Sequence, residues 1–320
     1  MARTTLVTGA LGQIGSELVP ALRARYGVHA VVAADLRGPP QDAPGVAGPF
    51  EQLDCTAIDQ VRAVVTRHDV GTIYHLVSLL SAASEHQPQA AWRLNLDSIF
   101  GVLEAAREHG SAVFFPSSIG AFGPSTPRDR APQETIMRPT TMYGVTKVAS
   151  ELLCDYYAHH FGVDARGLRL PGLISHVAMP GGGTTDYAVE IFYQAVRHRH
   201  YLCPLAPDTR LEMMFMPDAV RAMIELMEAD GTRLRHRNAY NITAINVSPE
   251  ELAAAIRVHL PDFTVAYSID PVRQAIAESW PRSIDDSAAR RDWGWSPGYG
   301  LAALTADMLE KIREKLAPAQ

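Results

Sequence analysis

Short apolar runs alternate with longer amphipathic stretches through the first half of the chain. The apolar runs predict strands at residues 4–8, 29–34, 50–53, 71–77, 111–115 and 165–170. Helical spacing of apolar residues between them predicts helices that include residues 16–25, 90–108 and 148–157. About six strands alternating with helices are typical of a doubly wound parallel sheet. We therefore predict an α/β fold in which helices cover both faces of such a sheet.

A glycine-rich turn joins the first predicted strand to the first predicted helix. Gly9 and Gly12 would let the backbone approach a pyrophosphate at the helix N-terminus, and Gly15 would let helix and strand pack closely. Asp35 ends the second strand, where a carboxylate accepts both ribose hydroxyls of an adenosine and repels a 2′-phosphate. Arg37 could hold such a phosphate instead. Because no basic residue lies in the turn, we expect a Rossmann sheet that binds NAD rather than NADP.

Polar residues follow several of the other strands. The carboxyl ends of parallel strands meet at the ligand-binding edge of a sheet, so Ser78, Ser81 and Ser118 are candidate ligand contacts. Asp54 either accepts a hydrogen bond from an adenine amino group or caps the helix that starts near residue 57. Asn95 either holds active-site backbone or is a solvated polar residue of the 90–108 helix. For Asp54 and Asn95 both alternatives stay open.

Tyr143 and Lys147 are four residues apart and would lie on one face of a helix. A free tyrosine titrates near ~10, about three units too high for a base at neutral pH. Its activation needs about 4 kcal/mol of phenolate stabilisation, at roughly 1.36 kcal/mol per unit. One exposed ion pair contributes at most about 1 kcal/mol. A lysine together with a cationic cofactor ring, both shielded from water, could supply all of this phenolate stabilisation.

After Pro171 the regular alternation of strands and helices ends. A glycine-rich segment over residues 179–187 predicts a mobile flap that places Thr184, Thr185 and Asp186 over a small polar ligand. Alternatively, this segment is a solvated turn that caps the helix at residues 188–197. Residues 213–215 and 219–228 are expected to return to the main sheet. We predict a dinucleotide-binding domain at 1–171 with 207–245, and a mainly substrate-binding lobe at 172–206 and 246–320.

Composition narrows the class of protein. The 320 residues are 47% hydrophobic, which suits two coupled lobes, and a net charge of −6 argues against a nucleic-acid partner. Three separated cysteines without a Cys-x-x-Cys pair suit a reducing, cytoplasmic compartment. Strand-like sequence from residue 4 leaves no room for a signal peptide, and no apolar run reaches the ~18 residues of a membrane span. No metal-binding or nucleophile-elbow motif is present, so we expect no metal.

The glycine turn, Asp35, Ser118 and the Tyr143/Lys147 pair, in this order, resemble the extended short-chain dehydrogenase/reductase superfamily. Four longer strings resemble its L-threonine 3-dehydrogenases: Ser78-Leu-Leu-Ser-Ala82, Pro116-Ser-Ser-Ile-Gly-Ala-Phe-Gly-Pro124, Pro180-Gly-Gly-Gly-Thr-Thr-Asp-Tyr-Ala188 and Arg273-Gln-Ala-Ile-Ala-Glu-Ser-Trp-Pro281. Together the resemblance covers nearly the whole chain.

The resemblance implies oxidation of L-threonine to 2-amino-3-oxobutyrate with NAD. Tyr143 would take the hydroxyl proton, Lys147 would lower the phenol pKa and bind the nicotinamide ribose, and Ser118 would hydrogen-bond the reacting oxygen. The expected substrate-binding residues are Ser81, Ser118, Tyr143, Gly182, Thr184, Thr185 and Asp186. The expected cofactor-binding residues are Gly9, Gly12, Gln13, Ile14, Gly15, Asp35, Arg37, Asp54, Cys55, Leu76, Ser78, Asn95, Tyr143, Lys147, Pro171 and Ile174.

Two other functions are alternatives to the oxidation of L-threonine. A nucleotide-sugar 4-epimerase or dehydratase shares the superfamily elements, but such dehydratases follow the catalytic hydroxyl with Asp-Glu, where this chain has Ile119-Gly120. A non-catalytic NAD-sensing protein would typically lose the tyrosine or the lysine. A carboxylate usually attracts an arginine, and the flap has none; Arg210 is the possible exception. The superfamily resemblance also implies a homodimer.

Overall fold

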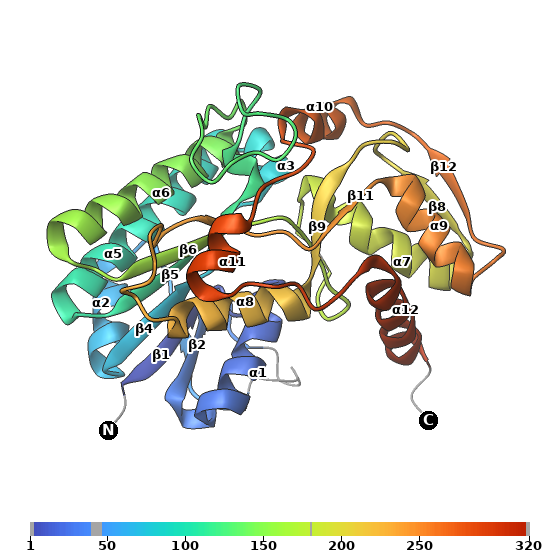
Figure 1. Ribbon diagram of the computed structural model, residues 1–320. Helices are drawn as coiled ribbons and strands as arrows, with labels where there is room; N and C mark the ends of the chain where they lie inside the picture. The colour runs from blue at the N-terminus through green and yellow to red at the C-terminus, as the bar shows by residue number, and fades with distance from the viewer. Residues whose placement is uncertain (1–2, 40–46, 180, 318–320) are drawn as a thin grey trace.

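The computed structural model describes residues 3–39, 47–179 and 181–317. Figure 1 shows a larger lobe, in which helices flank a sheet, beside a smaller lobe that carries the last helix. The main sheet has seven parallel strands in the order β10-β6-β5-β4-β1-β2-β3. They are β1 (Thr4–Thr8), β2 (Val31–Asp35), β3 (Phe50–Gln52), β4 (Val70–His75), β5 (Ala112–Ser118), β6 (Ala165–Leu170) and β10 (Tyr240–Asn241). The predicted doubly wound sheet is confirmed.

Helices cover both faces of this sheet, which is why β2 and β6 are buried along their whole length. One apolar core lies under α2 (Ile58–Arg67), α5 (Ser98–His109) and α6 (Met142–Phe161). A second core lies under α1 (Gly15–Tyr26) and α8 (Met216–Glu228). The helix α6 begins at Met142 because the Thr141 hydroxyl accepts a hydrogen bond from the Gly144 N–H at 3.1 Å.

The smaller lobe has its own core and two small sheets. Strands β7 (Gly172–Ile174), β9 (Leu211–Phe215) and β11 (Ile245–Val247) form one sheet, and β8 (His200–Cys203) pairs with β12 (Thr264–Tyr267) in the other. Its main helices are α7 (Tyr187–His198), α9 (Pro249–His259), α10 (Pro271–Ser279) and α12 (Leu301–Leu316). Three further short elements are α3 (Ser81–His86), η4 (Thr184–Asp186) and α11 (Ser287–Trp293).

Three sequence expectations need correction. The strand at residues 213–215 does not return to the main sheet, although α8 does pack against β6 and α1. An apolar run buried on both faces fits either sheet, so its pattern could not decide between them. Residues 29–30 belong to a 3₁₀ turn, η1 (Val28–Ala30), before β2. The long 90–108 helix is divided into α4 (Pro88–Trp92), a π-helical turn η2 (Arg93–Asp97) and α5.

Part of the expected connection at 38–49, and Pro180 of the flap, lie outside the described residues. No helix within the described ranges is long and apolar enough to cross a membrane. The division into two domains at the boundaries given above stays a prediction.

Candidate active site

A cleft of about 400 Å³ opens at the carboxyl ends of β1, β4 and β5 and extends to the flap of the smaller lobe. Most of the predicted site residues line it: Gly9, Gly12, Gln13, Ile14, Gly15, Arg37, Leu76, Ser78, Ser81, Ser118, Tyr143, Lys147, Pro171, Thr185 and Asp186. Seven others are not among the residues that line it: Asp35, Asp54, Cys55, Asn95, Ile174, Gly182 and Thr184. The fold therefore brings together strand ends that are more than a hundred residues apart in the chain.

The glycine turn forms one end of the cleft. Gly9 has a φ of +71°, which a residue with a side chain rarely adopts. A Cβ on Gly15 would lie 2.5 Å from the Gly9 carbonyl oxygen, so only glycine permits this close packing of α1 on the turn. Asp35 accepts a hydrogen bond from the Leu11 N–H at 3.0 Å, and also one from the Arg37 guanidinium at 3.2 Å. The carboxylate thus holds both the turn and the arginine that could otherwise meet a phosphate.

The residues of this end fit a dinucleotide. Gln13 lines the cleft, and its buried Nε2 has no hydrogen-bond partner among the residues that the structure describes. Since buried donors are rarely left unpaired, a phosphate oxygen beside the turn suits this amide. The first turn of α1 adds backbone N–H groups on the same side. Gln13, Gly9, Gly12 and Gly15 would hold the pyrophosphate, and Asp35 would lie nearest the ribose.

Ser118, Tyr143 and Lys147 meet beside this end, where β5 and α6 supply them. The phenol of Tyr143 hydrogen-bonds the Ser118 side chain. Lys147 donates from Nζ to the Pro116 carbonyl at 2.7 Å, and its Nζ lies 5.3 Å from the centre of the Tyr143 ring. Tyr143 is 8% exposed and Lys147 is 3% exposed. This hydroxyl, phenol and ammonium therefore share one nearly water-free corner.

Burial dominates the acid–base properties of this corner. It raises the pKa of Tyr143 to about 12, opposed by the hydrogen bond from Ser118. Burial also lowers the pKa of Lys147 to about 7, opposed by the negative charge of Glu151. In the protein alone the Tyr143 phenol therefore stays protonated at neutral pH, and the expectation that Lys147 together with a cationic cofactor ring lowers its pKa stays a prediction. The same desolvation penalises both charged forms, and Nζ is bound to the Pro116 carbonyl rather than to the phenol.

Asn95 holds the backbone beside this corner. Its Oδ1 accepts from the Leu79 N–H at 2.7 Å, and its Nδ2 donates to the Leu79 carbonyl at 3.2 Å and to the Thr146 hydroxyl at 3.0 Å. Of the two readings offered above, the structure shows the inward, backbone-holding one. The π-helical turn η2 carries Asn95, and such turns often redirect a side chain near functional sites.

The flap closes the far end of the cleft. The Asp186 carboxylate accepts from the backbone N–H groups of Gly182 at 2.9 Å and Gly183 at 2.8 Å. Burial nevertheless raises its pKa to about 6, with those two hydrogen bonds opposing the shift. Ser81 accepts from the Thr184 N–H at 3.0 Å, and the two hydroxyls lie 3.2 Å apart. Ser81 therefore ties the flap to the main lobe, and Asp186 orders the glycines within it.

Several residues take positions that the sequence did not reveal. Asp54 accepts from the backbone N–H and the hydroxyl of Thr56, so it stabilises the turn before α2 and does not cap that helix, whose N-cap is Ala57. Cys55 and Ile174 are buried in apolar cores. Arg210 binds Asn246 and Glu251 in the smaller lobe, outside the cleft lining. Trp280, which follows α10, lines the cleft and was not among the predicted site residues.

Fold and site together define a dinucleotide-dependent enzyme with a serine–tyrosine–lysine centre. The chain belongs to the NAD dependent epimerase/dehydratase family, whose model matches residues 5–247.

Relatives at high identity cover almost the whole chain. An uncharacterized epimerase/dehydratase of Staphylococcus haemolyticus is 53% identical over 97% of this chain and 98% of its own length. The structure of L-threonine dehydrogenase from Clostridium difficile is 50% identical, with a TM-score of 0.95 and 98% of each chain covered. A monomeric L-threonine 3-dehydrogenase from a metagenome is 42% identical, with a TM-score of 0.94 and coverage of 98% and 99%. UDP-glucose 4-epimerase from Thermotoga maritima, 20% identical with a TM-score of 0.83 and coverage of 98% and 99%, shares the fold alone.

Proposed function

We propose that this protein oxidises L-threonine at C3 to 2-amino-3-oxobutyrate, with NAD as its cofactor. The observation that carries the proposal is the presence, in one cleft, of the Ser118/Tyr143/Lys147 centre and of Asp186 opposite it. The first three groups suit a secondary alcohol, and a buried carboxylate suits an ammonium group. The 50% identity to an L-threonine dehydrogenase over nearly the whole chain supports the same substrate.

Each residue of the Ser118/Tyr143/Lys147 centre has its own role in the reaction. NAD, when bound, supplies the hydride acceptor and a positive charge. Tyr143 takes the proton of the substrate hydroxyl as the carbonyl forms, and Ser118 hydrogen-bonds the reacting oxygen. Lys147 in its ammonium form would bind the ribose of NAD and add positive charge beside the phenol. Since burial alone sets the phenol pKa near 12, the phenolate needs both positive charges in a shielded site.

Two residues of the flap would select the amino acid. Asp186 pairs with the substrate ammonium group in its ionised form. Thr185 lines the cleft at the same end. Ser81 and Thr184 hold each other and position the flap rather than the substrate.

A nucleotide-sugar epimerase is the second candidate, because it shares the fold and the catalytic centre. Among the described cleft-lining residues the only Lys and Arg side chains are Arg37 and Lys147. Arg37 binds Asp35, and Lys147 belongs to the catalytic corner. No Lys or Arg of the described lining remains at the flap end to hold a second diphosphate, which disfavours a nucleotide sugar. Arg273 acts on Asp186 through its charge but does not belong to that lining.

The direct test is NAD reduction, followed by NADH absorbance, with a panel of substrates. L-threonine, its allo diastereomer, L-serine, 3-hydroxybutyrate and a UDP-hexose are compared in parallel. We expect strong, stereoselective reduction with L-threonine. Activity on the UDP-hexose alone would favour the epimerase, and NAD binding without turnover of any alcohol would favour a cofactor-sensing protein.

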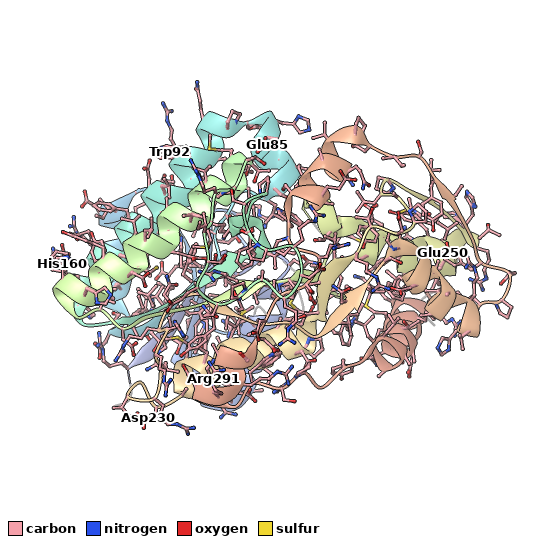
Figure 2. The ribbon with its side chains drawn as sticks, turned by 45° about the horizontal axis from the view of Figure 1, so that its top comes forward. Glu85, Trp92, His160, Asp230, Glu250 and Arg291 are labelled. Atoms are coloured by element: carbon pink, nitrogen blue, oxygen red, sulfur yellow. The ribbon has the colours of Figure 1, made fainter. Side chains whose placement is uncertain are left out.

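We also propose a cytoplasmic homodimer that pairs through α4, α5 and α6. The three cysteines are free and buried, as suits a reducing compartment. Large apolar side chains are exposed along these helices: Trp92, Phe100, Val145, Leu152, Tyr156 and Phe161. Figure 2 shows Trp92 beside α6 and His160 at its far end, so this apolar face runs along the helix. An exposed apolar stripe of this kind is typical of a subunit interface.

A further inference from the structure

Trp280 carries an unused hydrogen-bond donor at the substrate end of the cleft. The residue is 5% exposed and lines the cleft, and its buried indole Nε1 has no hydrogen-bond partner among the described residues. Among the described residues that line the cleft, only Gln13 also has a buried side-chain donor without a hydrogen-bond partner. Gln13 lies at the cofactor end. A buried N–H without a partner is costly and usually marks a place for a ligand.

The position of Trp280 assigns this donor to the substrate rather than to the cofactor. Trp280 follows α10, which packs against η4, the turn that carries Thr184, Thr185 and Asp186. Figure 1 shows α10 above the junction of the two lobes, beside α3. The glycine turn belongs to the opposite lobe, at the N-terminus of α1.

The charges at this end show which substrate group needs the donor. Asp186 is the carboxylate of the flap, so it meets the ammonium group of an amino acid and repels its carboxylate. The described lining has no Lys or Arg here to hold that carboxylate, and Ser81 is already bound to Thr184. An indole N–H and the Thr185 hydroxyl remain as neutral donors. Hydrogen bonds from neutral donors to a carboxylate are charge-assisted and strong enough to orient it.

We propose that the Trp280 indole N–H binds the carboxylate of the amino-acid substrate. The inference rests on the proposed function and deepens it, because it names the residue that distinguishes an amino acid from a simple amino alcohol. In this binding mode Trp280 holds the carboxylate and Asp186 holds the ammonium group. Both groups are attached to C2, so C3 is left to face Tyr143.

The test combines two protein variants with two substrates. Trp280→Phe removes the N–H and keeps an aromatic ring, and Trp293→Phe is a matched control. The Trp293 indole Nε1 is also buried without a partner, but it packs near Tyr240 and Trp295, away from the cleft. The substrates are L-threonine and L-threoninamide, which lacks the negative charge of the carboxylate.

We expect Trp280→Phe to raise the KM for L-threonine by about tenfold or more, the loss typical of a hydrogen bond to a charged group. The KM for L-threoninamide and the Kd for NAD should change less than about threefold, and Trp293→Phe should change none of them. An unchanged threonine KM, or an equal rise for both substrates, would overturn the inference while leaving the proposed function intact. Silence of the parent protein with L-threonine would overturn the proposed function, and the inference with it.

A second readout covers the case in which Trp280→Phe does not fold. The chain has four tryptophans, so four indole N–H signals are expected in a ¹⁵N–¹H spectrum of the unmutated protein. L-threonine should shift one cleft signal strongly downfield in the presence of NADH, and L-threoninamide should not. A spectrum in which no indole signal responds to L-threonine would contradict the assignment.

Discussion

Replacing Tyr143 by phenylalanine removes one hydroxyl from a buried site. The ring stays packed, so the main structural loss is the hydrogen bond to Ser118, worth about 1 kcal/mol of unfolding free energy. The catalytic loss is much larger, because Tyr143 is the group that we propose takes the substrate proton. General acid–base catalysis contributes ~10²–10⁴ in rate, so we expect kcat to fall by that factor, or about 3–5 kcal/mol of activation free energy.

The assay measures kcat from NADH absorbance at saturating L-threonine, with the Kd for NAD from protein fluorescence. Tyr156→Phe is the matched control, because Tyr156 lies on the same helix but is exposed. It should keep the kcat of the parent, and both variants should bind NAD within about threefold of the parent. A kcat of Tyr143→Phe within tenfold of the parent would refute the assignment of Tyr143 as the base.

The remaining predictions concern the flap and the subunit interface. Asp186 has its pKa raised to about 6 by burial, so kcat/KM for L-threonine should fall about tenfold per pH unit below 6, as the carboxylate that meets the ammonium group is protonated. Asp186→Asn should raise the threonine KM and remove this pH dependence; an unaltered KM would exclude Asp186 from substrate binding. The raised pKa also means that Asp186 favours the folded state below about pH 4 and that this contribution is lost as pH rises through about 6, so the unfolding midpoints of parent and variant should diverge in that window. Leu152→Asp, on the exposed face of α6, should convert a dimer to a monomer in light scattering; a monomeric parent, or a dimeric variant, would contradict the proposed interface.

The elements that sequence pattern predicted best are those with a regular period and clear ends. The run at Thr4–Thr8 followed by Gly9 and Gly15 predicts a strand, a turn and a helix, and the structure has β1, the glycine turn and α1 there. Such local signals need no knowledge of distant residues. The strand at Leu211–Phe215 failed for the opposite reason, since its partners β7 and β11 are chosen by packing far along the chain.

The site residues likewise include some that a local motif predicts and one whose position depends on distant packing. Tyr143, Lys147 and Ser118 follow local motifs, and the fold places all three at one cleft. Trp280 was missed because α10 reaches the cleft only through its packing against the flap, more than ninety residues earlier in the chain. The Pro116 carbonyl as the partner of the Lys147 Nζ could not be read from spacing either, because it depends on how α6 packs against β5.

The most direct test of the account follows the hydrogen at C3 of the substrate. L-threonine deuterated at C3 is incubated with the protein and NAD, and the reduced cofactor is analysed by mass spectrometry. We predict that its mass rises by one unit, with no such rise from L-threonine deuterated at C2. Reduced cofactor without the label, or no reduced cofactor from L-threonine at all, would contradict the claim that this protein removes a hydride from C3 of threonine.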